Sequence, residues 1–326
     1  MDSNLYYRAI PFTPENLKGS FENLKIEDGY LCLDNSDIGV FISEPTPIPE
    51  CDTILVSWNC YRRGGSVEMS VSYRKSSGEY SDFFSFGEWE TLPKSKSVKT
   101  AEGVMDEDTL KIPERTSSII IKAVLTSGAD GSGDPRLLRF AAAHNGKGAF
   151  DVDVNELPEE VSLDVPPRSQ MAVPVIGHVI CSPTSTSMCM DYQGVSLPTA
   201  DVAALCFDHG AEIYGNWLFN VAAAGEQGFD AHFDMYDIKA AMKSLANGVP
   251  LAFSIRTEEG QISNAPQAYV NGHLICVTGY RTVNGRLYFK VNDPACGDVA
   301  DVRREYDAEQ LSSGWKLGAV YVIKRG

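Results

Sequence analysis

Hydrophobic positions in the first 145 residues recur at short range and often alternate with polar positions. Runs such as GYLCLD, DTILVSWNCY and SVEMSVSYRK are rich in β-branched and aromatic residues, and turn-forming sequences separate them. Alternation with a period of two residues is typical of strands with one buried face. No stretch here has helical periodicity. Residues 1–150 are therefore predicted to form an all-β sandwich domain.

The stretch that follows differs from both of its neighbours. Residues 151–170 read DVDVNELPEEVSLDVPPRSQ, which is acidic and contains three prolines. Such a composition is typical of a connector between domains. We therefore place a boundary near residues 150–160 and predict a second domain over residues 160–326.

The second half begins with helical patterns and ends with strands. Asp234 could cap the last helix and Gly248 would end it. Four apolar strands come next, and the Asn284-Gly285 pair between the second and third is a strong hairpin signal. Helices followed by an antiparallel sheet give this half an α+β fold. The helices are predicted over residues 182–193, 199–209, 217–226 and 235–247.

Charge and composition limit the choice of partners. The chain has 326 residues and a formal net charge of -16. A protein that binds nucleic acid or an anionic membrane surface needs a basic face, so the acidic balance argues against both partners. No segment approaches the roughly 20 apolar residues that a membrane span requires.

The N-terminus and the cysteines indicate the compartment. The opening sequence MDSNLYYRAIPFTPENL lacks the basic stretch and apolar run of a secretory signal. We therefore expect a cytoplasmic protein, or a secreted one if a signal was removed beforehand. The 8 cysteines include no CxxC pair, and their spacing resembles neither a zinc site nor a disulfide framework. Free thiols in a reducing compartment are consistent with this pattern.

One cysteine lies at a predicted helix start. In ICSPTSTSMCMDY, residues 180–192, Ser182 and Pro183 suit the first turn of a helix, which places Cys181 at its N-terminus. Free backbone N–H groups and the positive end of the helix dipole stabilise a thiolate there and lower the pKa of the thiol. Cys181 is therefore the candidate nucleophile.

Two further candidates lie at one end of the predicted hairpin. His273 opens an apolar strand, and Asp293 closes the partner strand. A simple register about Asn284-Gly285 sets His273 opposite about residue 296, so twist or a bulge would have to bring Asp293 to the imidazole. A nucleophile, a base and a carboxylate that orients the base are the groups that a cysteine hydrolase needs.

Gln170 is the fourth candidate, eleven residues before Cys181. Its amide could donate to a developing oxyanion together with the backbone N–H of Cys181. This chemistry requires no metal and no organic cofactor, and the expected partner is a peptide or protein substrate. The same groups also support amidase and transpeptidase reactions. The sequence does not indicate an oligomeric state.

The order of these motifs resembles the papain-like cysteine peptidases, most of all the bacterial branch related to the bacteriocin-processing, double-glycine leader peptidases. The resemblance covers residues 165–326 and rests on a series of motifs in a fixed order. These are a Gln, then CSPTS opening a helix, then GHL on a strand, then NDPA after the next strand. The segment YGNWLFN at 214–220 also resembles a segment of those proteins. The SWN segment at 57–59 is similar to part of the accessory β domain of some members. The resemblance implies Cys181 as nucleophile, His273 as base, Asp293 as orienting residue and Gln170 as oxyanion donor.

The chain departs from these relatives at one position, and a second function stays open. Many relatives have Gly after the cysteine, whereas Ser182 follows here and puts the shape of the oxyanion pocket in doubt. The transporter-fused enzymes carry membrane and ATP-binding domains that this sequence does not resemble, so their leader-peptide substrate is not assumed. The alternative is a catalytically silent papain-like scaffold whose β-sandwich binds a peptide or glycan. Trp58 and Trp89 could then form a sugar platform, although aromatic residues in a sandwich are more often part of the core.

Other candidates have plainer interpretations. His178 is a rival base close to Cys181, and Cys206 with His209 has the spacing of a metal-binding pair but no evident further ligand. A redox link between Cys276 and Cys296, which flank the hairpin, also stays open. Buried core thiols are the simpler expectation for Cys189, Cys276 and Cys296.

Overall fold

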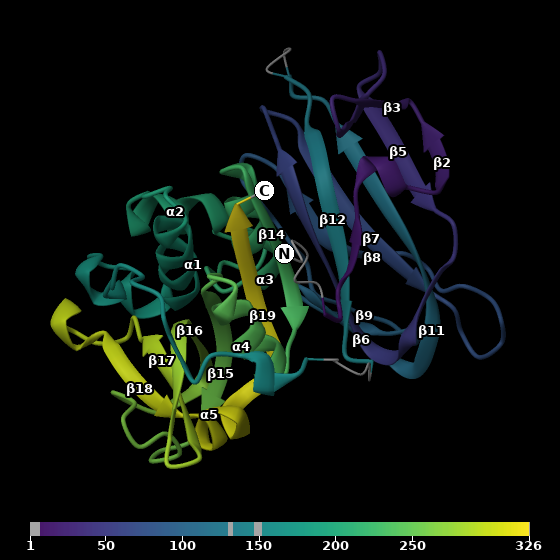
Figure 1. Cartoon of the computed structure of the whole chain (residues 1–326). Helices are drawn as coiled ribbons and strands as arrows, with labels where there is room; N and C mark the ends of the chain where they lie inside the picture. Colours follow the sequence, from purple (N-terminus) through teal and green to yellow (C-terminus); the bar gives the residue numbers. More distant parts are fainter. Residues whose placement is uncertain (1–6, 130–132, 147–151, 326) are drawn as a thin grey trace. The chain divides into compact units, whose positions relative to one another are not determined.

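The structure is a computed structural model that describes residues 7–129, 133–146 and 152–325 (Figure 1). It divides into two compact units. Unit 1 comprises Met1–Tyr7, Ala149–Cys206 and Asp234–Gly326, and unit 2 comprises Arg8–Gly148 and Phe207–Phe233. Residues 207–233 of the C-terminal half therefore belong with the N-terminal strands. The two-domain division into residues 1–150 and 160–326 stays a prediction.

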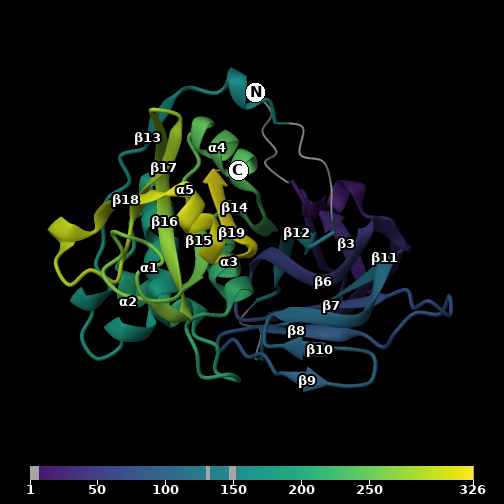
Figure 2. The same cartoon turned by 90° about the horizontal axis from the view of Figure 1, so that it is seen from below.

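Unit 2 is built mainly from antiparallel strands. Strand β11 pairs with β5, β6, β7 and β10, and β7 pairs with β8, which runs beside it in Figure 2. These pairings join the described strands in one sheet, so the β character is confirmed and the two-layer sandwich stays a prediction. The strands are β1 (Ile10–Phe12), β2 (Gly19–Glu22), β3 (Leu24–Glu27), β4 (Tyr30–Leu33), β5 (Ile38–Ser43), β6 (Thr46–Tyr61), β7 (Ser66–Tyr73), β8 (Phe84–Trp89), β9 (Val98–Lys99), β10 (Val104–Asp106), β11 (Thr109–Thr126) and β12 (Arg136–His144).

The SWN segment of β6 holds the end of residues 207–233. The Asn59 amide donates to the Ala231 carbonyl at 2.8 Å and accepts from the Ala231 N–H at 3.1 Å. The Ser57 hydroxyl accepts from the Phe233 N–H at 3.1 Å. All of these groups are buried, so the side chains replace the water that the backbone of residues 231–233 has lost.

Aromatic packing explains the tryptophans of unit 2. Trp58 and Trp89 are both 0% exposed, and both contact Phe219 of α3 (Trp217–Glu226). Asn216 caps this helix by accepting from the Phe219 N–H at 3.1 Å. The interpretation of Trp58 and Trp89 as a sugar platform is therefore wrong, because a binding platform must be exposed. The YGNWLFN segment likewise contributes core packing and a helix cap.

Unit 1 combines helices with an antiparallel sheet. Its strands lie in the order β19-β15-β16-β17-β18, β13 also pairs with β16, and α1 packs against β15, β16 and β19 (Figure 1). Helices α1, α2 and α4 precede the main strands of the sheet, as the predicted α+β class expects, whereas α5, which was not predicted, lies between β18 and β19. The elements are β13 (Glu160–Ser162), α1 (Cys181–Tyr192), α2 (Thr199–Cys206), α4 (Ile238–Ala246), β15 (Leu251–Thr257), β16 (Tyr269–Val283), β17 (Arg286–Asn292), β18 (Arg303–Asp307), α5 (Ala308–Gly314) and β19 (Trp315–Arg325).

The start of α4 corrects one expectation. Asp237 is the N-cap, since its side chain accepts from the Ala240 N–H at 2.9 Å. Asp234, the predicted cap, lies in β14 (Phe229–Met235), a strand that the sequence analysis missed. Every residue of β14 is buried although three are polar, so its pattern does not look like that of a buried strand. Gly248, with φ of 80°, follows the end of α4 as predicted.

The hairpin of β16 and β17 forms as predicted. Asn284 and Gly285 have φ of 50° and 76°, as a type I′ turn requires. The expected register holds from the turn to the pair Gly279–Lys290 and then shifts, so that Cys276 lies opposite Asn292. A bulge of the kind expected therefore lies between the turn and His273.

Candidate active site

Helix α1 begins at Cys181 and carries Pro183 in its first turn. Residues 182–190 of the helix are buried, whereas Cys181 is only partly buried. All eight cysteines lie in the described part of the chain, and the other seven are buried. Cys181 is therefore the cysteine that solvent and a substrate can reach most easily.

His273 and Asp293 come together at the end of the hairpin. His273 Nε2 lies 2.8 Å from Asp293 Oδ1, and the two side chains are 4% and 0% exposed. The thiol of Cys181 is hydrogen-bonded to the same imidazole. Because Nε2 faces the carboxylate, Nδ1 is the ring nitrogen that faces the sulfur. The structure thus brings three of the four predicted site residues into one chain of contacts.

The charges of Cys181 and His273 stabilise each other. Burial opposes ionisation of the Cys181 thiol and would raise its pKa. The hydrogen bond to His273 and the charge of His273 outweigh burial and lower the pKa of Cys181. Backbone hydrogen bonds from Leu274 and Ser182 act in the same direction. Burial also opposes protonation of His273, yet the Asp293 carboxylate and Cys181 raise the pKa of His273 to about 10. Both shifts favour the pair of a thiolate and an imidazolium over the neutral pair.

Asp293 stays ionised in spite of complete burial. Burial alone would raise its pKa, but His273 and the hydroxyls of Tyr269 and Tyr306 lower the pKa of Asp293 to about 2. A buried carboxylate is tolerated only when its lone pairs are paired in this way. Asp293 therefore supplies a fixed negative charge to the imidazolium at neutral pH.

Gln170 lies in a short 3-10 helix that is anchored beside Asp293. Its backbone N–H donates to the Pro294 carbonyl at 2.9 Å, and the Ser169 hydroxyl donates to the Cys296 carbonyl at 2.5 Å. The Gln170 side chain is buried, and within the described residues its amide oxygen has no hydrogen-bond partner. No hydrogen bond links Gln170 to Cys181 in that part of the chain. Its role as oxyanion donor stays a prediction.

Ser182, the position that departs from the relatives, is fully buried. Its hydroxyl lies 2.8 Å from the hydroxyl of Tyr321 in β19. The side chain thus has a partner inside unit 1 and is not exposed where a substrate would approach Cys181. Replacing a glycine by serine here adds a core hydrogen bond.

The rival candidates have other surroundings. His178 is exposed, and Cys206 donates its thiol to the Val202 carbonyl within α2. Among the described residues, no group of three or more His, Cys, Asp or Glu side chains is arranged to hold a metal ion. Cys276 lies 3.6 Å from Cys189, sulfur to sulfur, while Cys296 accepts from Arg304, so the hairpin cysteines are not linked to each other.

Sequence reasoning missed Tyr269 and Tyr306. Tyr269 precedes His273 by four residues on β16, and Tyr306 lies on β18, which the sequence analysis did not predict. Neither belongs to a recognisable motif. The one available signal was indirect: a buried carboxylate must find several donors, and tyrosine is a donor that suits an apolar interior.

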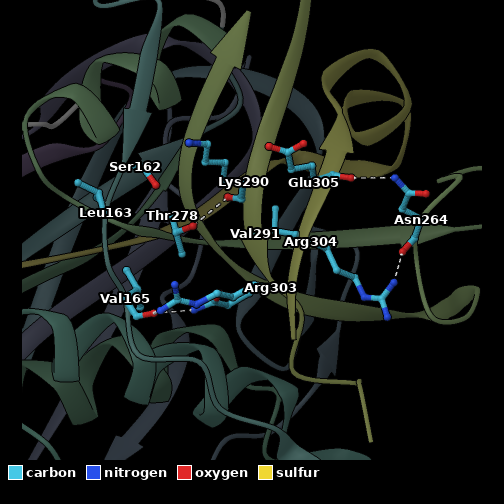
Figure 3. Close-up of a pocket in the computed structure, with 11 residues that line it drawn as sticks. Ser162, Leu163, Val165, Asn264, Thr278, Lys290, Val291, Arg303, Arg304 and Glu305 are labelled. Carbon is cyan, nitrogen blue, oxygen red and sulfur yellow. Dashed lines mark hydrogen bonds between the residues drawn. The ribbon is translucent and has the colours of Figure 1, made fainter. Parts of the chain in front are cut away.

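A separate cavity of about 400 Å³ lies on the β17–β18 side of unit 1 (Figure 3). None of the four predicted site residues lines it. Lys290 and Arg303 project from its walls, and they pair with Glu160 and Asp164 of the preceding connector. The cavity thus marks where the connector is fixed by charge to the sheet, and it is not the reaction site.

Residues 162–319 match the Peptidase_C39 like family. This match spans Cys181, His273, Asp293 and Gln170 and confirms the resemblance drawn from the motifs. No curated protein matches the chain. Within the described residues, no helix is both long and apolar enough to cross a membrane.

Three solved structures show weaker similarity to the chain. The peptidase domain of Streptococcus ComA, a bifunctional ABC transporter, is 18% identical over 47% of this chain and 97% of its own, with a TM-score of 0.34. A double-glycine motif protease from an AMS/PCAT transporter, in complex with the leader peptide, is 18% identical over 51% of this chain and 95% of its own, with a TM-score of 0.36. Procathepsin L 3 of Tenebrio molitor is 14% identical over 56% and 75%, with a TM-score of 0.38. Scores this low do not establish a shared fold, so the C39-like assignment rests on the family match.

Proposed function

We propose that the C39-like region is a papain-like cysteine peptidase that cleaves a peptide or amide bond through a covalent thioester. Cys181 is the nucleophile, His273 the general base and acid, and Asp293 the residue that orients His273. Gln170 and the Cys181 N–H bind the oxyanion. The β-rich residues 1–150 are the accessory domain of this two-domain protein.

The reaction proceeds in two steps. The Cys181 thiolate attacks the carbonyl carbon, the S–C bond forms, and the C–N bond breaks as the His273 imidazolium gives its proton to the leaving amine. Neutral His273 then takes a proton from water, which attacks the thioester and releases the acid and the thiol. Asp293 holds the imidazole in place through both steps, and no metal or organic cofactor takes part.

One observation carries this proposal: the imidazole of His273 lies between the Cys181 thiol and the Asp293 carboxylate, 2.8 Å from the latter. Each group alone has a plain structural explanation. A partly buried cysteine whose thiol has a lowered pKa, a base with a raised pKa and a buried carboxylate in one contact chain are the parts of an acyl-transfer site.

The test is turnover of a peptide library by the whole chain, with Cys181→Ala and Cys189→Ala as matched variants. Cys189 lies on the same helix but is buried. We expect cleavage by the unchanged protein and by Cys189→Ala, and none by Cys181→Ala. Cleavage that survives in Cys181→Ala would contradict the proposal.

A further inference from the structure

The two oxygens of Asp293 have different partners. Oδ1 lies 2.8 Å from His273 Nε2 and accepts from the Ala295 N–H at 3.0 Å. Oδ2 accepts from the hydroxyls of Tyr269 and Tyr306, each at 2.6 Å. Two phenols therefore occupy the oxygen that does not meet the imidazole, and the carboxylate cannot rotate without losing both.

Tyr269 also contacts the imidazole directly. Its ring stacks on that of His273 with a centroid distance of 4.0 Å and an interplanar angle of 14°. In a regular strand, residues four apart are separated by about 13 Å, so this stacking needs a local break in the strand. Gly272, with φ of 95°, and a register shift between Ile255 and Thr257 provide that break.

Tyr306 reaches the same oxygen from a different strand. It lies on β18 opposite Phe289 of β17 and is 1% exposed. Tyr269 approaches from β16 and is 4% exposed. Asp293 follows the end of β17, so the strands on both sides of β17 each contribute one phenol. Their two hydroxyls hold the carboxylate from two independent directions.

We infer that Tyr269 and Tyr306 are positioning residues of the site. Their hydroxyls fix Asp293 Oδ2 so that Oδ1 points at His273 Nε2, and the Tyr269 ring fixes the plane of the imidazole. This inference rests on the proposed function of Cys181 and His273, and it adds the two residues that hold the third member of the site. Neither tyrosine touches the reacting sulfur.

The charges around Asp293 support this role. Burial and the Asp293 carboxylate raise the pKa of both phenols. Both phenols therefore stay protonated and donate hydrogen bonds over the pH range of the test described below. Donation by both hydroxyls favours the ionised form of Asp293. The other charged or titratable groups nearby are Arg304 of β18 and Cys296, which lies between β17 and β18. Cys181 of α1 acts through His273.

The test is the pH profile of Cys181 alkylation by iodoacetamide, followed by mass spectrometry of the intact folded chain from pH 3 to 7. The variants are Tyr269→Phe and Tyr306→Phe, which each remove one hydroxyl. Tyr280→Phe is the matched control, because Tyr280 is also buried on β16 but donates to the Pro158 carbonyl. Circular dichroism at each pH confirms that the variants are folded.

We expect each phenylalanine variant to move the acid midpoint of alkylation upward by roughly one pH unit, because Asp293 becomes protonated more easily and His273 loses its counterion. The Tyr280→Phe midpoint should equal that of the unchanged protein. If either site variant does not fold, the other carries the test, since each removes a hydroxyl from the same oxygen.

Two outcomes are informative in opposite ways. In the first outcome, Cys181 is activated, but its acid midpoint is the same in both site variants and in Tyr280→Phe. This outcome would overturn the positioning role and would not contradict the proposed function. A Cys181 that titrates like a free thiol in the unchanged protein would overturn the proposed function and this inference with it.

Discussion

Asp293 is the residue whose charge controls the site. Its carboxylate is the main favourable influence that raises the pKa of His273 to about 10. His273 is therefore protonated at neutral pH and loses its proton as the pH rises through about 10. In the proposed reaction, the imidazolium that protonates the leaving group is thus present below that pH and absent above it.

Replacing Asp293 by Asn tests this dependence. The neutral amide keeps the size of the side chain but removes the charge, so the pKa of His273 should fall and the alkaline limb of kcat/KM should move to lower pH. We expect kcat/KM to drop by about 10²- to 10⁴-fold at neutral pH. The control is Asp164→Asn, which removes an exposed carboxylate of the same unit. It should leave the alkaline limb and the value of kcat/KM unchanged. An unmoved alkaline limb in Asp293→Asn would refute the assignment.

At the residue scale, the sequence pointed to three residues that the structure brings together, but it did not point to the residues that support them. Cys181, His273 and Asp293 could be chosen because helix starts and strand ends leave a pattern in the sequence. Tyr269 and Tyr306 could not be chosen, since a donor to a buried carboxylate can come from any strand that happens to pass it. The Ser182–Tyr321 contact was hidden for the same reason.

At the element scale, the hairpin turn sets the register that places His273 near Asp293. Gly285 has φ of 76°, and a Cβ added there would meet nothing within 4 Å. Substitution by alanine therefore adds backbone strain without any clash.

We expect Gly285→Ala to lower the free energy of unfolding by about 1 kcal/mol, measured by urea denaturation. Gly297→Ala is the matched control, because its added Cβ also meets nothing within 4 Å and its backbone is not in the left-handed region. Equal stability of the two variants would mean that the turn is not strained by a side chain.

Most elements with a clear period were predicted, but β14 was missed although its residues alternate. Helices α1 and α3 and strands β15 to β17 carry apolar runs or caps close to their observed ends. Strand β14 was missed because Asp234 was predicted to cap a helix over residues 235–247, although apolar and polar residues alternate in β14. The cap of α4 moved from Asp234 to Asp237 as a result.

At the scale of the whole molecule, the chain order does not match the spatial units. Residues 207–233 lie in the C-terminal half but pack with the N-terminal strands. Asn59 satisfies both backbone groups of Ala231 in a buried setting, so this contact should be costly to lose.

We expect Asn59→Ala to reduce the free energy of unfolding by roughly 2–4 kcal/mol, because a buried N–H and a buried C=O would lose their partners. The exposed Asn155→Ala, which loses only a local contact with Asp153, should change the stability by less than about 0.5 kcal/mol. Similar unfolding curves for both variants would show that β6 does not secure residues 207–233.

In the proposed function, His273 activates the Cys181 thiol. The most direct measurement is the rate at which iodoacetamide labels Cys181 at pH 6 in the unchanged protein and in His273→Ala, with N-acetylcysteine as the reference thiol. An ordinary thiol is almost fully protonated at this pH. We expect Cys181 to react at least about 10-fold faster than the reference thiol, and we expect His273→Ala to abolish the difference. Labelling at the reference rate, or labelling that His273→Ala does not slow, would contradict the proposed function.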